Sequence, residues 1–167
     1  LKMPEYVTLI RGKSGHPYNM MYGIDDTFDG VMFVGYHSAA GTDTSPLAHT
    51  NTGNSSYIKI NGQIASEFMI NSYIAAAHKV PVLFISGDKG ICEEAKRLIP
   101  NITAVETKIG VGGAAINISP DKVIKLIKKN AEEALKKDVS QNLIKLPEAF
   151  EEEIRFKQHI NAYKMSF

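Results

Sequence analysis

Two histidines and one glutamate carry side chains that could bind a metal ion or transfer a proton. His37 and His49 flank a loop rich in glycine and threonine, and Glu67 follows in the next predicted helix. Imidazole is the commonest metal-binding side chain, and a carboxylate beside the apolar face of a helix needs a partner such as a metal ion. His37 and Glu67 could therefore bind a metal, and His49 could move a proton while metal-activated water attacks a substrate.

Each of these residues also has an ordinary structural interpretation. A histidine after a strand is often only packed or hydrogen-bonded, and a glutamate in the first turns of a helix is favoured by the helix dipole and is usually solvated. A hydrolytic zinc site usually needs three or more protein ligands per metal, and often a bridging carboxylate. These residues alone do not complete such a site, so we expect part of it to lie outside this chain.

The segment before His37 indicates where the site lies. Residues 28–36 form a short apolar run bounded by glycines, which is typical of a strand buried on both faces of a parallel sheet. His37 then lies at the carboxyl end of this strand, where open α/β proteins place their ligands. Residues 38–56 form a long polar connection, and we interpret this loop as functional.

The rest of the pattern alternates strands with helices. We expect a strand at 57–60, a turn at Asn61-Gly62, a helix at 63–78, a strand at 81–86, a helix at 89–98, a strand at 103–108, a flexible glycine turn at 110–113, a helix from 120 to about 137, and a half-exposed strand at 150–156. This order predicts a three-layer α/β fold with a largely parallel sheet and a C-terminal strand-containing appendage. We divide the chain into a core at 1–140 and the start of a β-containing extension at 141–167.

Composition favours a single ordinary globular domain that acts on a small ligand. The chain has 167 residues, of which 44% are apolar and 22% charged, with a net charge of +1. It lacks the basic, aromatic-rich stripe of a nucleic-acid binder and any apolar stretch long enough for a membrane span. Cys92 is the only cysteine, which excludes an intrachain disulfide and favours a cytoplasmic location. The chain begins with Leu1 instead of methionine and stops at Phe167, so we expect a fragment or a split subunit.

Five separated segments share the order and spacing of a known family. They are Gly35-Tyr36-His37-Ser38-Ala39-Ala40-Gly41-Thr42, Leu47-Ala48-His49-Thr50, Ile60-Asn61-Gly62 with Glu67 and Asn71, Val80-Pro81-Val82 with Ser86-Gly87-Asp88, and Cys92-Glu93-Glu94-Ala95. Over roughly residues 5–137 the chain resembles the D-aminopeptidase family of bacterial zinc peptidases, the dipeptide-transport-associated M55 type.

The resemblance implies a complete functional assignment. It implies two zinc ions per complete subunit, hydrolysis of short peptides with an N-terminal D-residue, and a homo-oligomer that is a ring-based decamer with an enclosed chamber. Carried over to this sequence, it makes His37 and Glu67 metal ligands and His49 the catalytic acid and base.

One departure from the family pattern is large. The family also takes ligands from an N-terminal Asp-x-Glu-Gly strand and from an Asp-Ser-His-Gly segment, and neither occurs here. We therefore expect the chain alone to be inactive unless another chain completes the site. Two alternatives remain open: a non-catalytic binding or assembly subunit of the same fold, and another metal-dependent amide hydrolase on the same scaffold.

Overall fold

A four-stranded sheet forms the centre of the computed structural model, which describes residues 3–167. Its strands are β1 (Val31–Tyr36), β4 (Val82–Asp88), β5 (Thr103–Val111) and β6 (Ala114–Asn117), in the order β1-β4-β5-β6. The first three run parallel, and β6 pairs antiparallel with β5. All seven residues of β4 are buried, which explains the apolar sequence of this strand.

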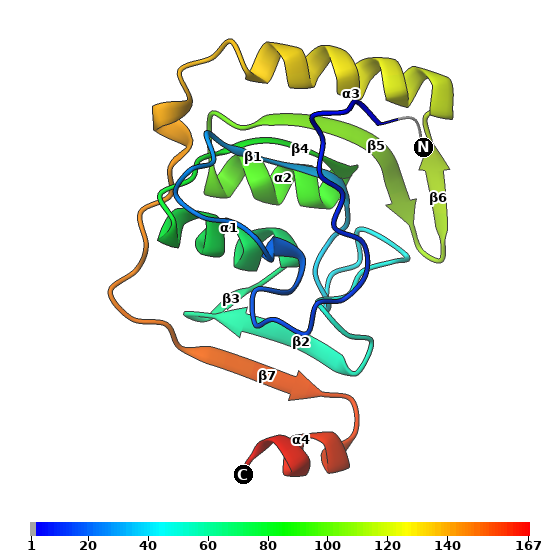
Figure 1. Cartoon of the computed structure of the whole chain (residues 1–167). Helices are drawn as coiled ribbons and strands as arrows, with labels where there is room; N and C mark the ends of the chain where they lie inside the picture. The colour runs from blue at the N-terminus through cyan, green and yellow to red at the C-terminus, as the bar shows by residue number, and fades with distance from the viewer. Residues whose placement is uncertain (1–2) are drawn as a thin grey trace.

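Helices cover both faces of this sheet (Figure 1). On one face, Phe33 and Ile85 pack in a common core with residues of α1 (Glu67–Ala77) and α2 (Lys89–Leu98). On the other face, Phe84 belongs to a separate core with residues of α3 (Pro120–Ala134). The predicted three-layer α/β fold with a largely parallel sheet is therefore confirmed.

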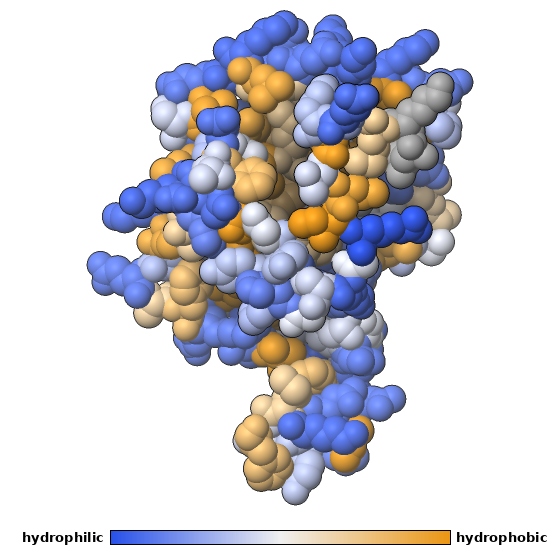
Figure 2. Space-filling model, in the orientation of Figure 1, coloured by the Kyte–Doolittle hydropathy of each residue, from blue (hydrophilic) through white to orange (hydrophobic). Residues whose placement is uncertain are grey.

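A second, smaller sheet lies beside the first and has the order β3-β2-β7. It consists of β2 (Ser55–Ile60), β3 (Gln63–Ile64) and β7 (Glu152–Phe156), and the short helix α4 (His159–Met165) follows β7. We call β7 and α4 the C-terminal arm. Figure 1 shows the arm at the end of the molecule opposite α3, and Figure 2 shows this end as a narrow lobe with both hydrophobic and hydrophilic surface. Strand β7 of the predicted extension pairs with β2 of the predicted core, so both parts contribute to this sheet. The division of the chain at residue 140 stays a prediction.

The predicted helix at 63–78 begins later than expected. Gln63 and Ile64 form β3, which pairs antiparallel with the end of β2. The turn between these strands has positive φ at both Asn61 (49°) and Gly62 (78°), as a two-residue hairpin turn of the primed type requires. Ser66 then caps α1, since its side chain accepts a hydrogen bond from the Met69 backbone N–H.

The glycine turn at 110–113 is shorter than expected. Gly110 still belongs to β5, where it pairs with Ala115 of β6, a strand that the sequence did not predict. A Cβ atom on Gly110 would lie 2.4 Å from the Thr44 carbonyl oxygen, so β5 at this point touches the loop that carries His49. Helix α3, which the sequence predicts from residue 120 to about 137, ends three residues earlier, at Ala134.

The remaining regular segments are two turns of 3-10 helix, η1 (Asn19–Met21) and η2 (Val139–Asn142). In the part of the chain that the structure describes, no helix has the length and apolar character needed to cross a membrane.

Candidate metal centre

The site lies where the sheet and α1 meet the loop of residues 38–54, which we call the site loop. His37 directly follows β1, as predicted, and Glu67 is the first residue of α1. His49 comes from the site loop itself. The backbone N–H of Asn51 donates to Glu67 Oε1 at 2.9 Å, so the loop and the helix are joined at the carboxylate. Elements that are distant in sequence thus bring the three predicted site residues together.

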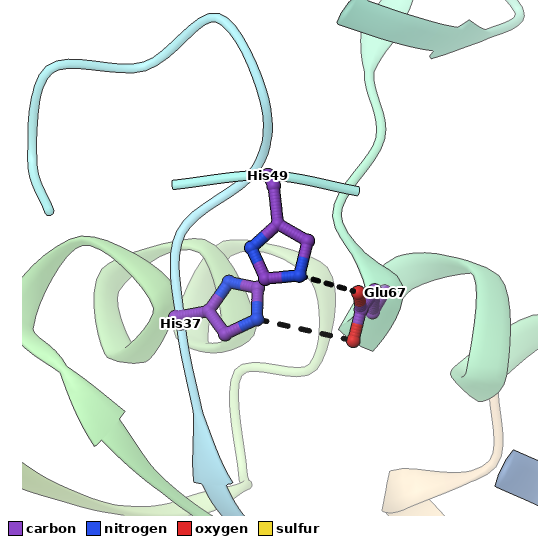
Figure 3. Close-up of side chains that lie close together, drawn as sticks. All are labelled: His37, His49 and Glu67. Atoms are coloured by element: carbon purple, nitrogen blue, oxygen red, sulfur yellow. Dashed lines mark ion pairs between the residues drawn. The ribbon is translucent and has the colours of Figure 1, made fainter. Parts of the chain in front are cut away.

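The three side chains converge on one point (Figure 3). Glu67 Oε2 lies 4.0 Å from His37 Nε2, and Glu67 Oε1 lies 3.7 Å from His49 Nε2. The two imidazole rings stack with centroids 4.2 Å apart. One nitrogen from each histidine and one oxygen from Glu67 all lie within 4.8 Å of one another, which is the spacing of atoms that can share a metal ion. Among residues 3–167, no other histidine, cysteine or carboxylate cluster has this geometry.

Both histidines have their other ring nitrogen against a backbone carbonyl. His37 Nδ1 lies 3.1 Å from the Ser38 oxygen, and His49 Nδ1 lies 2.7 Å from the Leu47 oxygen. A carbonyl oxygen only accepts, so in a neutral imidazole each Nδ1 carries the proton and each Nε2 has a free lone pair. Metal-ligating histidines are commonly oriented in this way. Two imidazole nitrogens and a carboxylate oxygen form a donor set that suits zinc.

The two histidines differ in exposure. The His37 side chain is 19% exposed and that of Glu67 11%, whereas the His49 side chain is 42% exposed. A half-buried imidazole beside a half-buried carboxylate fits a fixed ligand, and a more exposed imidazole can reach a bound substrate. The geometry also allows His49 to serve as a third metal ligand.

The site loop is held by buried hydroxyl groups. Thr50 is fully buried; its Oγ1 accepts a hydrogen bond from the Ala40 backbone N–H at 3.1 Å and donates to the Ala65 carbonyl at 2.9 Å. Ala65 lies two residues before Glu67, so Thr50 links the loop to the start of α1. The loop that the sequence marked as functional is therefore ordered around the three site residues.

Tyr36, the last residue of β1, is a neutral neighbour of the site. Burial raises the pKa of its hydroxyl to about 12, a hydrogen bond from Asn71 opposes this shift, and the negative charge of Glu67 adds to it. The Tyr36 hydroxyl accepts that hydrogen bond from Asn71 Nδ2 at 2.9 Å. It therefore stays protonated at neutral pH and does not compete for a cation.

In the sequence, Asp88 is named only as part of a family motif, and no role at this site was predicted for it. Asp88 is fully buried at the carboxyl end of β4, and its carboxylate binds Ser38, the residue that follows His37. The available signal was an aspartate at the end of a buried strand adjacent to β1, in a run otherwise free of charge. Such a residue needs hydrogen-bond donors from a neighbouring segment.

Two other side chains with possible chemistry, His16 and Cys92, do not belong to this cluster. His16 Nδ1 accepts a hydrogen bond from the Tyr18 backbone N–H, and its ring packs near Tyr18 and Tyr22. Cys92 is fully buried, and burial together with the charge of Glu106 raises the pKa of its thiol to about 12. Cys92 is therefore not a thiolate nucleophile at neutral pH.

Comparison with known proteins identifies relatives of this chain. All residues from 1 to 167 match the sequence profile of the Peptidase_M55 family, described as D-aminopeptidase. A D-aminopeptidase of Bacillus subtilis (strain 168) is 35% identical over 120 residues, which are 71% of this chain and 43% of that protein. The solved structure of the Zn-dependent D-aminopeptidase DppA from Bacillus subtilis, a self-compartmentalizing protease, matches with a TM-score of 0.88 and 31% identity.

That structural match covers 97% of this chain and 59% of the DppA chain. This chain therefore spans about half the length of the relatives it matches. The identity and the fold similarity nevertheless extend over most of its own length. The family profile covers the whole chain, and therefore the strand, loop and helix that supply His37, His49 and Glu67. The chain belongs to the peptidase M55 family of D-aminopeptidases.

Proposed function

We propose that the protein is a zinc-dependent aminopeptidase that hydrolyses short peptides with an N-terminal D-residue. The observation that carries this proposal is the convergence of His37, His49 and Glu67, with two free Nε2 lone pairs facing one carboxylate. Family membership and the names of the two relatives support the substrate class.

In this proposal the residues have separate roles. His37 and Glu67 hold the metal, through Nε2 and a carboxylate oxygen. Zinc, when bound, supplies the Lewis acidity that polarises a scissile carbonyl and activates water for attack. His49 takes a proton at Nε2 and returns it to the leaving amine, a role that its greater exposure and its separate loop position favour. The Asn51 N–H fixes the Glu67 carboxylate while these proton transfers occur.

Two zinc ions per complete subunit are part of the same proposal. Two hydrolytic zinc ions need more ligands than these three side chains offer, and residues 3–167 contain no second cluster of metal-binding groups. The remaining ligands would come from outside this chain. A ring-based decamer with an enclosed chamber completes the proposal, supported by the self-compartmentalizing relative. We also propose a cytoplasmic location, since the single cysteine leaves no intrachain disulfide.

The test is peptide hydrolysis by the protein purified in its native assembly. We expect hydrolysis of a D-alanyl dipeptide over its L-alanyl counterpart, loss of activity after zinc chelation, and recovery when zinc is restored. His49→Gln should keep its zinc and lose about 10²- to 10⁴-fold in turnover, the usual contribution of a general acid or base. His16→Gln is the matched control, since His16 lies outside the site.

Three results would contradict the proposal or part of it. Zinc-free protein without hydrolysis of either dipeptide would identify a non-catalytic subunit. Equal hydrolysis of the L-alanyl dipeptide would identify a different amide hydrolase. A His49→Gln variant that loses zinc together with activity would make His49 a metal ligand and not the proton carrier.

A further inference from the structure

Ser38, the residue after His37, is bound by a buried carboxylate. Its backbone N–H donates to Asp88 Oδ2 at 2.8 Å, and its hydroxyl donates to Asp88 Oδ1 at 2.5 Å. Asp88 also accepts from the Ile91 backbone N–H at 2.9 Å. Asp88 is 0% exposed and Ser38 2% exposed, so these hydrogen bonds are shielded from water. Hydrogen bonds to an ionised acceptor in such an environment are strong and geometrically restrictive.

The other side of Ser38 faces the metal centre. Its carbonyl oxygen is the group that lies 3.1 Å from His37 Nδ1. Ser38 therefore connects two partners: the carboxylate holds its N–H and its hydroxyl, and its carbonyl holds the imidazole. In many metal sites a carboxylate orients a ligating histidine directly. Here a single serine residue stands between the carboxylate and the imidazole.

Neighbouring contacts confine Ser38 to this position. Thr44 Oγ1 donates to Ser38 Oγ at 2.7 Å from within the site loop. The start of α2 also approaches so closely that a Cβ atom on Gly90 would lie 2.5 Å from Ser38 Oγ and even closer to Thr44 Oγ1. A glycine at position 90 is thus needed for the start of α2 to reach the serine.

His49 has no comparable support. Its Nδ1 contacts the Leu47 carbonyl at 2.7 Å, and the backbone N–H of Leu47 donates to Ser45 Oγ at 3.2 Å. Leu47 itself is 59% exposed. His37 is thus linked through Ser38 to the buried carboxylate of Asp88, whereas His49 contacts an exposed turn. This difference suits a fixed metal ligand at His37 and an adaptable proton carrier at His49.

We propose that Asp88 is a positioning residue for His37. Acting through Ser38, it fixes the Nδ1–H tautomer and the ring direction of His37, so that the free Nε2 faces Glu67. The consequence for metal binding rests on the proposed function, because that function makes His37 a ligand. The effect of Asp88 on the His37 tautomer is independent of the proposed function and can be measured in metal-free protein.

The test uses Asp88→Asn, which keeps the size of the side chain but loses one acceptor. With its amide nitrogen toward the Ser38 N–H, the asparagine can no longer hold that peptide group. Ser38→Ala is the second variant; it loses the hydroxyl and its contacts with Asp88 and Thr44 but keeps the Ser38 backbone N–H that Asp88 binds, so it remains informative if Asp88→Asn does not fold. Asn142→Ala is the control for general destabilisation, because buried Asn142 donates to the Val82 carbonyl at the opposite end of β4.

Two readouts are needed: the tautomer of each histidine by ¹⁵N NMR in metal-free protein, and the zinc affinity by calorimetry. In Asp88→Asn we expect His37 to shift toward the Nε2–H form while His49 keeps its Nδ1–H form, and zinc affinity to fall about tenfold. Ser38→Ala should shift the same signals by less. Asn142→Ala should leave both histidines unchanged.

The outcomes separate this proposal from the proposed function. If His37 keeps its Nδ1–H tautomer in every variant that folds, or if Asn142→Ala shifts it equally, Asp88 is not a positioning residue. If the unmodified protein binds no zinc, the proposed function fails, and the tautomer measurement still decides the role of Asp88.

Discussion

The site loop and the C-terminal arm differ in opposite senses in their secondary structure and in the burial of their side chains. The site loop has almost no regular secondary structure, yet it contains five buried residues, namely Ser38, Ala39, Ala40, Ser45 and Thr50. The arm consists of a strand and a helix, yet none of the residues from 152 to 165 is buried. Its apolar side chains include Tyr163, which is 61% exposed, and Met165, which is 70% exposed.

This difference shows that regular backbone and fixed side chains are separate properties. The site loop is held by hydrogen bonds between side chains and backbone groups. Asp88, on β4, accepts from the Ser38 backbone N–H, and Thr50 accepts from the Ala40 N–H and donates to the Ala65 carbonyl. In the arm, backbone pairing with β2 forms the strand, while the side chains remain in water. Replacing a buried polar side chain of the site loop should therefore have a large effect on stability or zinc affinity, and replacing an exposed one in the arm a small effect.

The largest effect should come from the metal ligand. His37→Ala should reduce zinc affinity by more than about 100-fold, because even the loss of an outer partner of a ligand costs up to about that much. The matched substitution in the arm is His159→Ala, which removes an exposed histidine at the start of α4 and should leave zinc affinity unchanged. Calorimetric zinc titration of both variants measures this difference. Equal affinities would show that His37 does not hold the metal.

The next effect concerns the stability of the site loop. Thr50→Val preserves the shape of the side chain but leaves the Ala40 N–H and the Ala65 carbonyl without their buried partner. We expect a loss of about 2–4 kcal/mol in the free energy of unfolding, from two unsatisfied groups. Urea unfolding measures this loss. Thr52→Val is the control, since the Thr52 hydroxyl accepts only from the exposed Asn54 N–H, and the change in stability should stay within about 0.5 kcal/mol. Similar losses in both variants would remove the distinction between buried and exposed hydroxyls.

The sequence predicted the elements whose signal is local. The apolar run before His37 marked β1 and its carboxyl end, and helical spacing marked α2 and α3. His37, His49 and Glu67 were identified by residue type and by position relative to those elements. Their convergence on one point is consistent with those predictions, while the individual roles of the three residues remain predictions.

The features that were missed depend on contacts between distant segments. Gly110 resembles a turn residue in sequence, but pairing with Ala115 keeps it in a strand. Gln63 fits a helical pattern, but pairing with Ile60 places it in β3. The partner of Asp88 is fifty positions earlier in the chain, at Ser38. No periodicity within a window of residues reports such a pair, because the window does not contain both members.

Two carboxylates, one half-buried and one exposed, should make stability depend on pH in opposite ways. Glu94 on α2 accepts a hydrogen bond from Ser66 Oγ at 2.5 Å, and burial raises its pKa while that hydrogen bond opposes the shift. A raised pKa in the folded state means that Glu94 favours folding below its ordinary pKa, and that this contribution is lost as the pH rises through the folded value. Glu94→Gln keeps an acceptor for Ser66 without the charge.

We therefore expect Glu94→Gln to be more stable than the unmodified protein at pH 7, and the two proteins to converge below the ordinary glutamate pKa. The change at pH 7 should be smaller than that of Thr50→Val, because no buried group loses its partner. Thermal unfolding at a series of pH values measures it. A variant that is less stable at pH 7 would show that ionised Glu94 is well accommodated.

The smallest effect is expected for Glu153 on β7, with the opposite sign. Tyr57 donates a hydrogen bond to Glu153 Oε1 at 2.6 Å, and Lys59 Nζ lies 3.3 Å from Oε2. The Tyr57 hydrogen bond is the main cause that lowers the pKa of Glu153, and Lys59 and Arg155 add to it. Its stabilising contribution is present above the ordinary glutamate pKa and is lost as the pH falls through the lowered value. Glu153→Gln should thus be slightly less stable at pH 7 and equal to the unmodified protein in acid. Because this carboxylate is exposed, salt should reduce the difference. If Glu94→Gln and Glu153→Gln shifted stability in the same direction, burial would not be what distinguishes the two carboxylates.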